Sequence, residues 1–533
     1  MRLVRFLLLL SVCLPFLEVQ AQVDYRKDAI YVRLQPGQTH TAISTNSLEP
    51  QSPDLLQSVF NTYGGISFTQ AFPGVDAFKE LYLLKFSQAD KIENLISDLN
   101  ALEFVKYAEM IPVPNASSVK REAGIAQVPG DMNDDLMWYI GQINMDWDLP
   151  LNLDFKVKIA VVDNGIRLSH EDIASNLWVN PGEGKYPDGI DNDGNGLIDD
   201  IHGADLADSN GNPDVPSSAS NTYFGHGTKV AGIVSAQNNN GKGIVSVGVN
   251  AEVMAVKVVP DNPPNNRDDY YVAAYEGVMY AAMKGAHIIN MSWGTPVFSN
   301  TQKDIIDFVL AQGIILVAAA GNAGSNEYIY PAAFDGVIAV GATDDQDFKA
   351  PSSNYGPYID VMAPGVKIYT TLAGSDNAYG TETGTSMSAP IVSAFAGLLL
   401  SQFPTKADQI ELAIKKGCDN IEINNYPIRD QIGAGRINIH QSYELLKSGK
   451  LSVATQRSVQ NIRLYPNPNA GVVYVPNEAH LSSLSVYDLN GKLVSSVPVQ
   501  NQQADLRFLA LKGMYLIRAN SEEQQYVARI IFQ

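Results

Sequence analysis

Three short motifs carry side chains that together could perform covalent catalysis. Asp163 ends an apolar run and precedes Asn-Gly, His226 stands between two glycines, and Ser386 lies in Gly-Thr-Ser-Met-Ser ahead of an apolar stretch over 391–400. A hydroxyl becomes a nucleophile when an imidazole takes its proton and a carboxylate orients that imidazole. Each residue alone has an ordinary reading, as a turn aspartate, a structural histidine or an N-cap serine. Together they predict attack on a carbonyl carbon.

A fourth motif supplies a donor for the charge that such an attack creates. Asn322 follows the apolar run that ends in Ala-Ala-Ala-Gly, and its side-chain amide can donate a hydrogen bond. Ser386 is expected at the start of a helix, where backbone N–H groups lack intrahelical acceptors. We expect the Asn322 amide and the Ser386 N–H to hold the oxyanion.

Strand and helix signals alternate around these motifs. Apolar runs of the kind that is buried on both faces of a sheet lie at 158–162, 253–259, 287–291, 314–318 and 337–340, and helical patterns lie at 228–237, 269–284 and 302–312. This alternation predicts an α/β domain with a mostly parallel sheet. Ligand sites in such sheets form at the carboxyl ends of the strands, so the motifs are expected to meet there.

The motifs follow one another in the chain order Asp, His, Ser, which is the order in subtilisin. Residues 155–440 resemble the subtilase family of serine proteases, with further matching motifs at Asn290–Gly294, Val361–Gly365 and Gly433–Asn438. The resemblance implies a subtilisin-like three-layer domain over 134–447 and a serine endopeptidase that works through an acyl-enzyme.

The resemblance also implies residue roles. Ser386 would attack the scissile carbonyl, His226 would transfer the proton, and Asp163 would orient the imidazole. The substrate groove would be lined by two segments whose backbones pair with an extended peptide, namely Ser292, Trp293 and Gly294, and Ala319, Ala320 and Gly321. Core packing is an equally good reading of the Trp293 side chain.

One position departs from the family pattern. Many subtilases have Ser or Thr after the aspartate, whereas this chain has Asn164. An amide can still donate a hydrogen bond near the carboxylate, so we expect tuning of the activity and not its loss, and the departure leaves the pH optimum open.

An acidic loop follows the spacing of a calcium site. Oxygen ligands are expected from Asp191, Asp193, Asn195, the carbonyl of Leu197, and Asp199 or Asp200. The twelfth position has Gly203 where a calcium loop usually has Glu, so Asp199 or Asp200 would have to close the shell. Mutual repulsion of the carboxylates favours a structural calcium ion over a plain acidic loop.

The N-terminal part shows an export signal and a small domain. Residues 1–21 combine Arg2 and Arg5 with an apolar run and a small-residue cleavage pattern. Residues 22–120 show β-rich runs at 29–34 and 81–86 and a helical pattern at 89–102, which predicts an α+β unit, and 121–133 read as a linker. The unit resembles a subtilase propeptide, a folding aid and inhibitor of the protein's own active site. A permanent accessory domain is the alternative.

The C-terminal part changes to short alternating strands after a linker over 448–461, which predicts a β-sandwich over 462–533. The motifs Leu464–Pro468, Val486–Lys492 and Gly513–Ile517 resemble the sorting domain of type IX secretion cargo. This resemblance implies a Gram-negative source, passage through the periplasm and across the outer membrane by the type IX machinery, and a secreted or cell-surface location.

The composition of the chain limits the classes of molecule that it is expected to bind. The net charge of −20 argues against nucleic acid and anionic membranes, and no apolar run after the signal reaches the roughly 20 residues of a spanning helix. Cys418 is the sole cysteine outside the signal and is expected to be a packing residue. A non-catalytic adhesin would normally have lost a triad member, and a lipase would show the Gly-x-Ser-x-Gly elbow. Peptides or proteins are therefore the expected substrates.

Overall fold

The computed structural model describes most of the chain between Asp24 and Phe532. The described residues are 24–37, 43–44, 59, 61–116, 136–147, 149, 155–216, 224–264, 267, 269–449, 451, 459–461, 464, 472–474, 483–487, 493–499, 503–507, 512–520 and 525–532. The predicted export signal at 1–21 and the predicted linker at 121–133 lie outside these residues. The chain divides into two compact units, Met1–Ser448 and Gly449–Gln533, which are considered separately.

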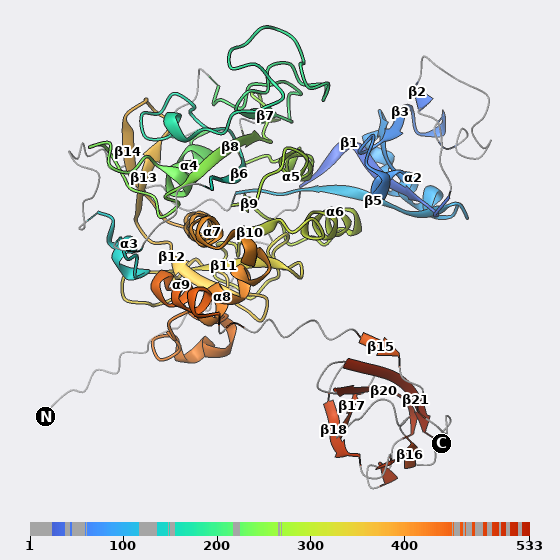
Figure 1. The fold of residues 1–533 in the computed structure, drawn as a ribbon. Helices are drawn as coiled ribbons and strands as arrows, with labels where there is room; N and C mark the ends of the chain where they lie inside the picture. Colours follow the sequence, from blue (N-terminus) through green and yellow to red (C-terminus); the bar gives the residue numbers. More distant parts are fainter. Residues whose placement is uncertain are drawn as a thin grey trace, which may run out of the picture. The chain divides into compact units, whose positions relative to one another are not determined.

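A seven-stranded sheet forms the centre of the first unit (Figure 1). All neighbouring strands in it are parallel. The strand order is β12 (Val361–Pro364), β11 (Val337–Thr343), β10 (Ile315–Ala319), β9 (Ile288–Met291), β6 (Val157–Asp163), β8 (Ala251–Lys257) and β7 (Gly203–Asp205). The predicted α/β class with a mostly parallel sheet is confirmed.

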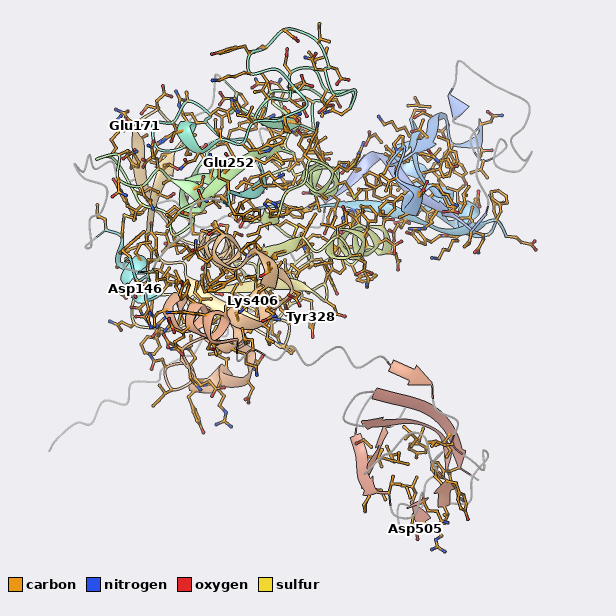
Figure 2. All side chains as sticks on the ribbon, viewed as in Figure 1. Asp146, Glu171, Glu252, Tyr328, Lys406 and Asp505 are labelled. Atoms are coloured by element: carbon orange, nitrogen blue, oxygen red, sulfur yellow. The ribbon has the colours of Figure 1, made fainter. Side chains whose placement is uncertain are left out.

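Helices cover both faces of this sheet and bury it (Figures 1 and 2). The helices of this domain are α3 (Trp138–Gln142), α4 (His226–Ser235), α5 (Ala274–Met283), α6 (Asn300–Leu310), α7 (Thr385–Gln402), α8 (Ile410–Lys416) and α9 (Ile439–Ser448). Short 3-10 helices lie at Ala174–Asn176, Pro404–Gln409 and Tyr426–Gln431. A hairpin of β13 (Ile368–Leu372) and β14 (Ala378–Glu382) packs against α4 and leads into α7.

The alternation of side chains along β6 decides which helix each residue meets. A Cβ added to Gly397 of α7 would lie 2.9 Å from Cδ1 of Ile159, whereas one added to Gly277 of α5 would lie 2.9 Å from Cγ1 of Val162. Odd-numbered residues of this strand therefore face α7, and even-numbered residues face α5. Asp163, the last residue of β6, has the parity of the α7 face, and α4 packs against α7 on that side.

The N-terminal domain is a five-stranded antiparallel sheet with its own core. Its order is β2 (Ile43–Ser44), β3 (Gly65–Gln70), β4 (Leu81–Phe86), β1 (Asp24–Leu34) and β5 (Val105–Val113). The predicted helix begins as a 3-10 turn at Ala89–Lys91 and continues as α2 (Ile92–Asn100), and another 3-10 turn lies at Asp76–Phe78. Apolar residues of β1, β4 and α2 pack together beneath the sheet.

The second unit is all-β in its described residues. One sheet has the order β15 (Val459–Asn461), β21 (Gln525–Phe532), β20 (Gly513–Asn520), β17 (Ser483–Tyr487) and β18 (Leu493–Pro498), and a second pairs β16 (Val472–Tyr474) with β19 (Gln503–Asp505). Val473, Leu484 and Ile530 are among its buried apolar residues. Residues 465–468 and 488–492 of the motifs that resemble a sorting domain lie outside the described residues.

Within the described parts of the chain, no helix has both the length and the apolar character needed to cross a bilayer.

Candidate active site

The carboxylate of Asp163 is completely buried at the carboxyl end of β6. Its Oδ1 accepts a hydrogen bond from the backbone N–H of Asn164 at 2.8 Å. Nδ1 of His226 lies 2.9 Å from Oδ1 and 3.0 Å from Oδ2. An ionised carboxylate can only accept hydrogen bonds, so Nδ1 carries the proton of this pair.

His226 reaches Asp163 because the first turn of α4 approaches β6 very closely. A Cβ at Gly227 would overlap the carbonyl oxygen of Gly165 and lie 3.0 Å from Cβ of Asp163, so only glycine fits there. The Gly227 N–H donates to Oδ1 of Asn164 at 2.9 Å, which ties α4 to the turn after β6. The residue that departs from the family pattern thus helps to fix the His226 helix in place.

The second ring nitrogen of His226 is ready to act as a base. With the proton on Nδ1, Nε2 presents a lone pair. This atom is buried and makes no hydrogen bond to any described residue. The structure has no hydrogen bond between Nε2 and the Ser386 hydroxyl; such bonds are often long in resting enzymes and tighten when substrate binds.

Ser386 lies in the first turn of α7 and is almost completely buried. Pro390 follows four residues later and has no N–H for the Ser386 carbonyl. The hydroxyl of Ser292 replaces that donor at 2.9 Å. Ser292 in turn accepts from Asn290 Nδ2 at 2.9 Å, and Asn290 Oδ1 accepts from Ser393 of the same helix at 2.9 Å. This buried network fixes the backbone of the serine relative to β9.

The side chain of Asn322 is fixed beside the same helix start. Its Oδ1 accepts from the backbone N–H of Thr385 at 2.8 Å, and the Thr385 hydroxyl accepts from the Gly321 N–H at 3.2 Å. Because Oδ1 is the acceptor in this bond, the amide nitrogen is the donor end of this side chain.

A family model described as the subtilase family matches residues 154–416. The thermophilic serine proteinase of Bacillus sp. strain AK1 is 32% identical over 333 residues, which cover 62% of this chain and 71% of the relative. Thermitase of Thermoactinomyces vulgaris is 36% identical over 264 residues, 50% of this chain and 81% of the relative. The chain belongs to the subtilase family. It is accordingly a subtilisin-like serine protease, and the resemblance in the sequence is confirmed.

Two further comparisons concern the fold and the tail. Fervidolysin from Fervidobacterium pennivorans, a keratinolytic enzyme related to subtilisin, superimposes with a TM-score of 0.59 at 21% identity, covering 94% of this chain and 72% of that one. This confirms the subtilisin-like fold. Residues 463–533 match a secretion system C-terminal sorting domain, which indicates that this subtilase is secreted or carried on the cell surface.

The residues predicted to line the substrate groove differ in what they do. Gly294 forms an antiparallel bridge with Asn115, with N···O distances of 3.0 and 3.1 Å. The Trp293 side chain is buried, and its Nε1–H donates to the Val162 carbonyl at 2.8 Å, so only the backbone of this residue can serve the groove. Ser292 uses its hydroxyl to hold Ser386.

The second groove segment does not offer a free strand edge. The Ala320 N–H donates to the Val340 carbonyl at 3.0 Å, and its carbonyl accepts from the Tyr358 hydroxyl at 2.9 Å. The Gly321 carbonyl accepts from the Asn354 N–H at 2.9 Å, and Ala319 ends β10 within the sheet. The expectation that both segments pair with a peptide therefore differs from the structure, in which Ala319–Gly321 can form only a wall.

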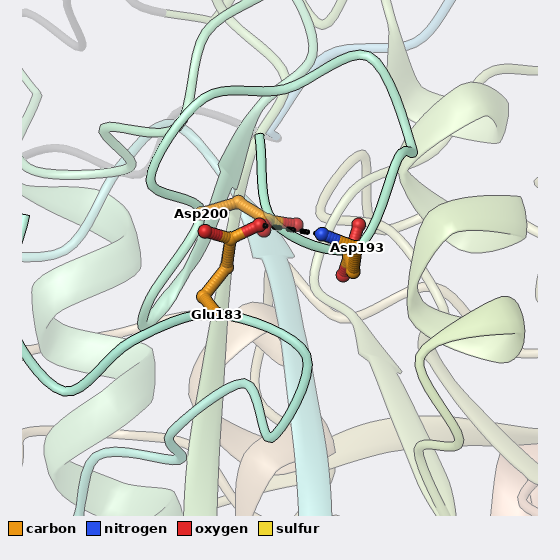
Figure 3. Close-up of side chains that lie close together, drawn as sticks. All are labelled: Glu183, Asp193 and Asp200. Carbon is orange, nitrogen blue, oxygen red and sulfur yellow. Dashed lines mark hydrogen bonds between the residues drawn. The ribbon is translucent and has the colours of Figure 1, made fainter. Parts of the chain in front are cut away.

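The acidic loop has a different arrangement from the predicted calcium shell (Figure 3). Of its carboxylates, Asp193 and Asp200 come together with Glu183, which lies outside the predicted motif, with oxygens within 4.8 Å of one another. Asp191 accepts from the backbone N–H groups of Gly194, Asn195 and Gly196, and Asp199 accepts from those of Asp188 and Gly189. The Leu197 N–H donates to Oδ1 of Asn195 at 2.7 Å.

Lys284 already supplies a positive charge to this group. Its ammonium pairs with Asp193 and lies 3.1 Å from Asp200. Burial opposes the ionisation of Asp193, but hydrogen bonds from Lys284 and Asn180 outweigh burial and hold its pKa below the usual value.

Cys418 is not activated as a nucleophile. Burial, with a contribution from Asp419, raises the pKa of its thiol to about 12, and Sγ–H donates to the Ile414 carbonyl at 3.2 Å. A thiol that stays protonated at neutral pH agrees with a packing role.

Residues whose position depends on the tertiary fold carry no sequence motif. Glu183 belongs to no motif, and Tyr271 lies in a stretch without a chemical signature, yet the Tyr271 hydroxyl contacts Asp163. Pro390 was a usable signal, because a proline four residues after Ser386 leaves the serine carbonyl in need of another donor.

Proposed function

We propose that this subtilase is a secreted endopeptidase in which Ser386 is the nucleophile, His226 the general base and acid, and Asp163 the residue that orients the imidazole. The observation that carries the proposal is the buried Nε2 of His226, left without a partner while Asp163 holds the other ring nitrogen. A buried nitrogen without a hydrogen-bond partner costs free energy of folding. A catalytic role is one reason for a protein to retain such a group.

The chemistry follows from these positions. Nε2 accepts the hydroxyl proton as Ser386 attacks the peptide carbonyl, and Asp163 stabilises the imidazolium that forms. Asn322 and the Ser386 N–H donate to the oxyanion. The imidazolium then protonates the leaving amine, and water hydrolyses the acyl-enzyme by the same steps in reverse order.

Digestion of a proteome-derived peptide library tests this assignment. The matched variants are Ser386→Ala and Ser388→Ala. The N-terminal domain of each is removed with the same added protease, and that protease is taken out before the library is added. Ser388 lies on the same helix turn but donates to the carbonyls of Ala363 and Pro364 at 3.1 and 3.0 Å. We expect Ser386→Ala to lose roughly a million-fold in turnover and Ser388→Ala to keep cleaving. Equal cleavage of the library by both variants would contradict the assignment of Ser386 as the nucleophile.

We also propose that residues 22–120 are a propeptide that inhibits the enzyme until it is removed. The chain after β5 supports this, because Asn115 pairs with Gly294 while the Pro114 carbonyl accepts from the Tyr271 N–H at 3.4 Å. A strand between these two segments occupies the place of an extended peptide substrate.

Polar contacts that fit a docked inhibitor support the same proposal. The Glu109 carboxylate accepts from the N–H groups of Thr301 and Asn300, at 2.8 and 3.2 Å, in the first turn of α6. Negative charge is favoured at a helix N-terminus. Arg33 lies 2.6 Å from Asp304 on the same helix. Apolar contacts accompany these polar ones, since the rings of Phe78 and Phe308 of α6 have centroids 5.2 Å apart.

Maturation can be followed on a gel. We expect wild-type protein to lose its N-terminal domain while Ser386→Ala stays at precursor mass. A permanent accessory domain predicts identical masses for the two proteins.

For the tail, we propose export across the outer membrane by the type IX machinery. The match of residues 463–533 to a sorting domain supports this route. A chain truncated before residue 463 should remain inside the cells of a host with that machinery, whereas its appearance in the medium would refute the route.

We propose calcium as a structural ion of the acidic loop. Residues 183–200 contain six carboxylates and one lysine, and oxygens from Glu183, Asp193 and Asp200 converge. Hard carboxylate oxygens suit calcium. Lys284 neutralises only part of this charge, so Glu183, Asp193 and Asp200 are the residues that would hold the ion, with the effect of relieving their repulsion.

A further inference from the structure

The hydroxyl of Tyr271 lies against the aspartate and histidine of the active site. It donates to Oδ1 of Asp163 at 2.8 Å, and its oxygen lies 3.4 Å from Nδ1 of His226. The side chains of Tyr271 and Asp163 are both completely buried. Neither chain order nor motif spacing pointed to this residue.

We infer that Tyr271 is a positioning residue for catalysis, whose hydroxyl holds the Asp163 carboxylate in the orientation that His226 requires. The inference rests on the proposed roles of Asp163, His226 and Ser386.

The carboxylate needs such a restraint. The terminal torsion of an aspartate has a broad energy minimum, so its orientation must come from hydrogen bonds. The backbone N–H of Asn164 donates one hydrogen bond to Oδ1 at 2.8 Å, and the Tyr271 hydroxyl donates a second at the same distance. His226 spans both oxygens at 2.9 and 3.0 Å. Without the hydroxyl, the Asp163 carboxylate loses one of the hydrogen bonds that restrain its rotation. The His226 imidazole, which is hydrogen-bonded to the carboxylate, then shifts with it.

The Tyr271 ring packs against a side chain that is tied to the strand carrying Asp163. Its ring lies against Trp293, with centroids 6.2 Å apart. Trp293 is fixed by its 2.8 Å hydrogen bond to the Val162 carbonyl, one residue before Asp163. The hydroxyl is therefore positioned by the same strand end that it restrains, and a phenylalanine can keep the ring packing.

The chain offers a matched control in Tyr275. This tyrosine is also buried and packs on the same Trp293, with centroids 5.5 Å apart. Its hydroxyl makes no hydrogen bond to any described residue. Removing it changes the same aromatic cluster without touching Asp163.

The test compares wild type, Tyr271→Phe, Tyr275→Phe and Ser386→Ala, all made as full chains. Active sites are titrated with an irreversible phosphonate after maturation, and kcat and KM are measured on one peptide substrate together with the melting temperature. We expect Tyr271→Phe to lower kcat about tenfold, the order of one hydrogen bond to a charged group, with KM unchanged. Tyr275→Phe should match wild type in both constants.

Three results would overturn the inference: wild-type kcat in Tyr271→Phe, a change in KM alone, or the same loss of kcat in Tyr275→Phe. An active Ser386→Ala would instead reject the proposed triad, so the two failures are distinguishable.

Discussion

At the scale of single residues, the site is defined by which atoms already have partners. Asp163 fixes Nδ1 of His226 and leaves Nε2 open. The Asn322 side-chain oxygen accepts from the Thr385 N–H, and the side-chain nitrogen is the proposed donor to the oxyanion. In both side chains, the hydrogen bond made by one atom determines which other atom has the proposed catalytic role.

Asn322 gives a sharp prediction at this scale. Asn322→Asp keeps an oxygen for the Thr385 N–H but has no amide donor, and Asn322→Ala loses both. Both variants should lower kcat roughly a hundred- to a thousandfold with little change in KM, because the donor acts on the transition state. Steady-state kinetics on a peptide substrate measure this. Wild-type kcat in Asn322→Asp would show that the amide nitrogen has no part in holding the oxyanion.

At the scale of elements, α4 and α7 bring their first turns to the carboxyl end of β6, on the face set by the parity of Asp163. The packing of α4 depends on glycine at 227 and on the Asn164 side chain. Pro390 gives up a helical hydrogen bond in α7, and Ser292 of the strand-end loop replaces it.

Gly227→Ala tests the close approach of α4. The added methyl group overlaps the Gly165 carbonyl, so the helix must move and the bond from His226 to Asp163 must lengthen. A displacement of this kind should lower kcat roughly a hundredfold. The control is Gly141→Ala in α3, where a Cβ meets no atom within 4 Å. If Gly227→Ala and Gly141→Ala turn over substrate at the same rate, the close approach is unimportant.

Many of the strands could be predicted from the sequence, because long apolar runs and flanking glycines carry strong local signals. The strands β6, β8, β9, β10 and β11 were expected within a few residues of their bounds. The short strands β7 and β12 and the β13–β14 hairpin were not, because three to five residues carry too little pattern. The roles of Ser292 and Tyr271 depend on contacts between distant segments, which no local spacing encodes.

At the scale of the whole molecule, the catalytic domain is preceded by a domain whose residue Asn115 pairs with Gly294, and it is followed by a sorting domain. This order along the chain is the one expected if, as proposed, the N-terminal domain inhibits the precursor until export. The acidic loop lies on the catalytic domain itself, so the proposed ion would stay with the enzyme after removal of the N-terminal domain.

Chelation tests the calcium proposal on the mature enzyme. We expect a chelator to lower the melting temperature by calorimetry, and added calcium to restore it, because a ligand bound only to the folded state stabilises it. Asp193→Asn should lose this response. Asp208→Asn, in the separate acidic group around Lys257, should keep it. An unchanged melting temperature in the wild type would rule out a stabilising calcium ion.

The central claim is that Ser386 is the residue activated by His226, and covalent labelling tests it most directly. The mature enzyme is inactivated with a serine-reactive phosphonate, and the labelled residue is found by peptide mass spectrometry. The account predicts one adduct, on Ser386 and not on Ser388 of the same peptide, formed in step with the loss of activity and absent in His226→Ala. An adduct elsewhere, or full activity with Ser386 labelled, would contradict it.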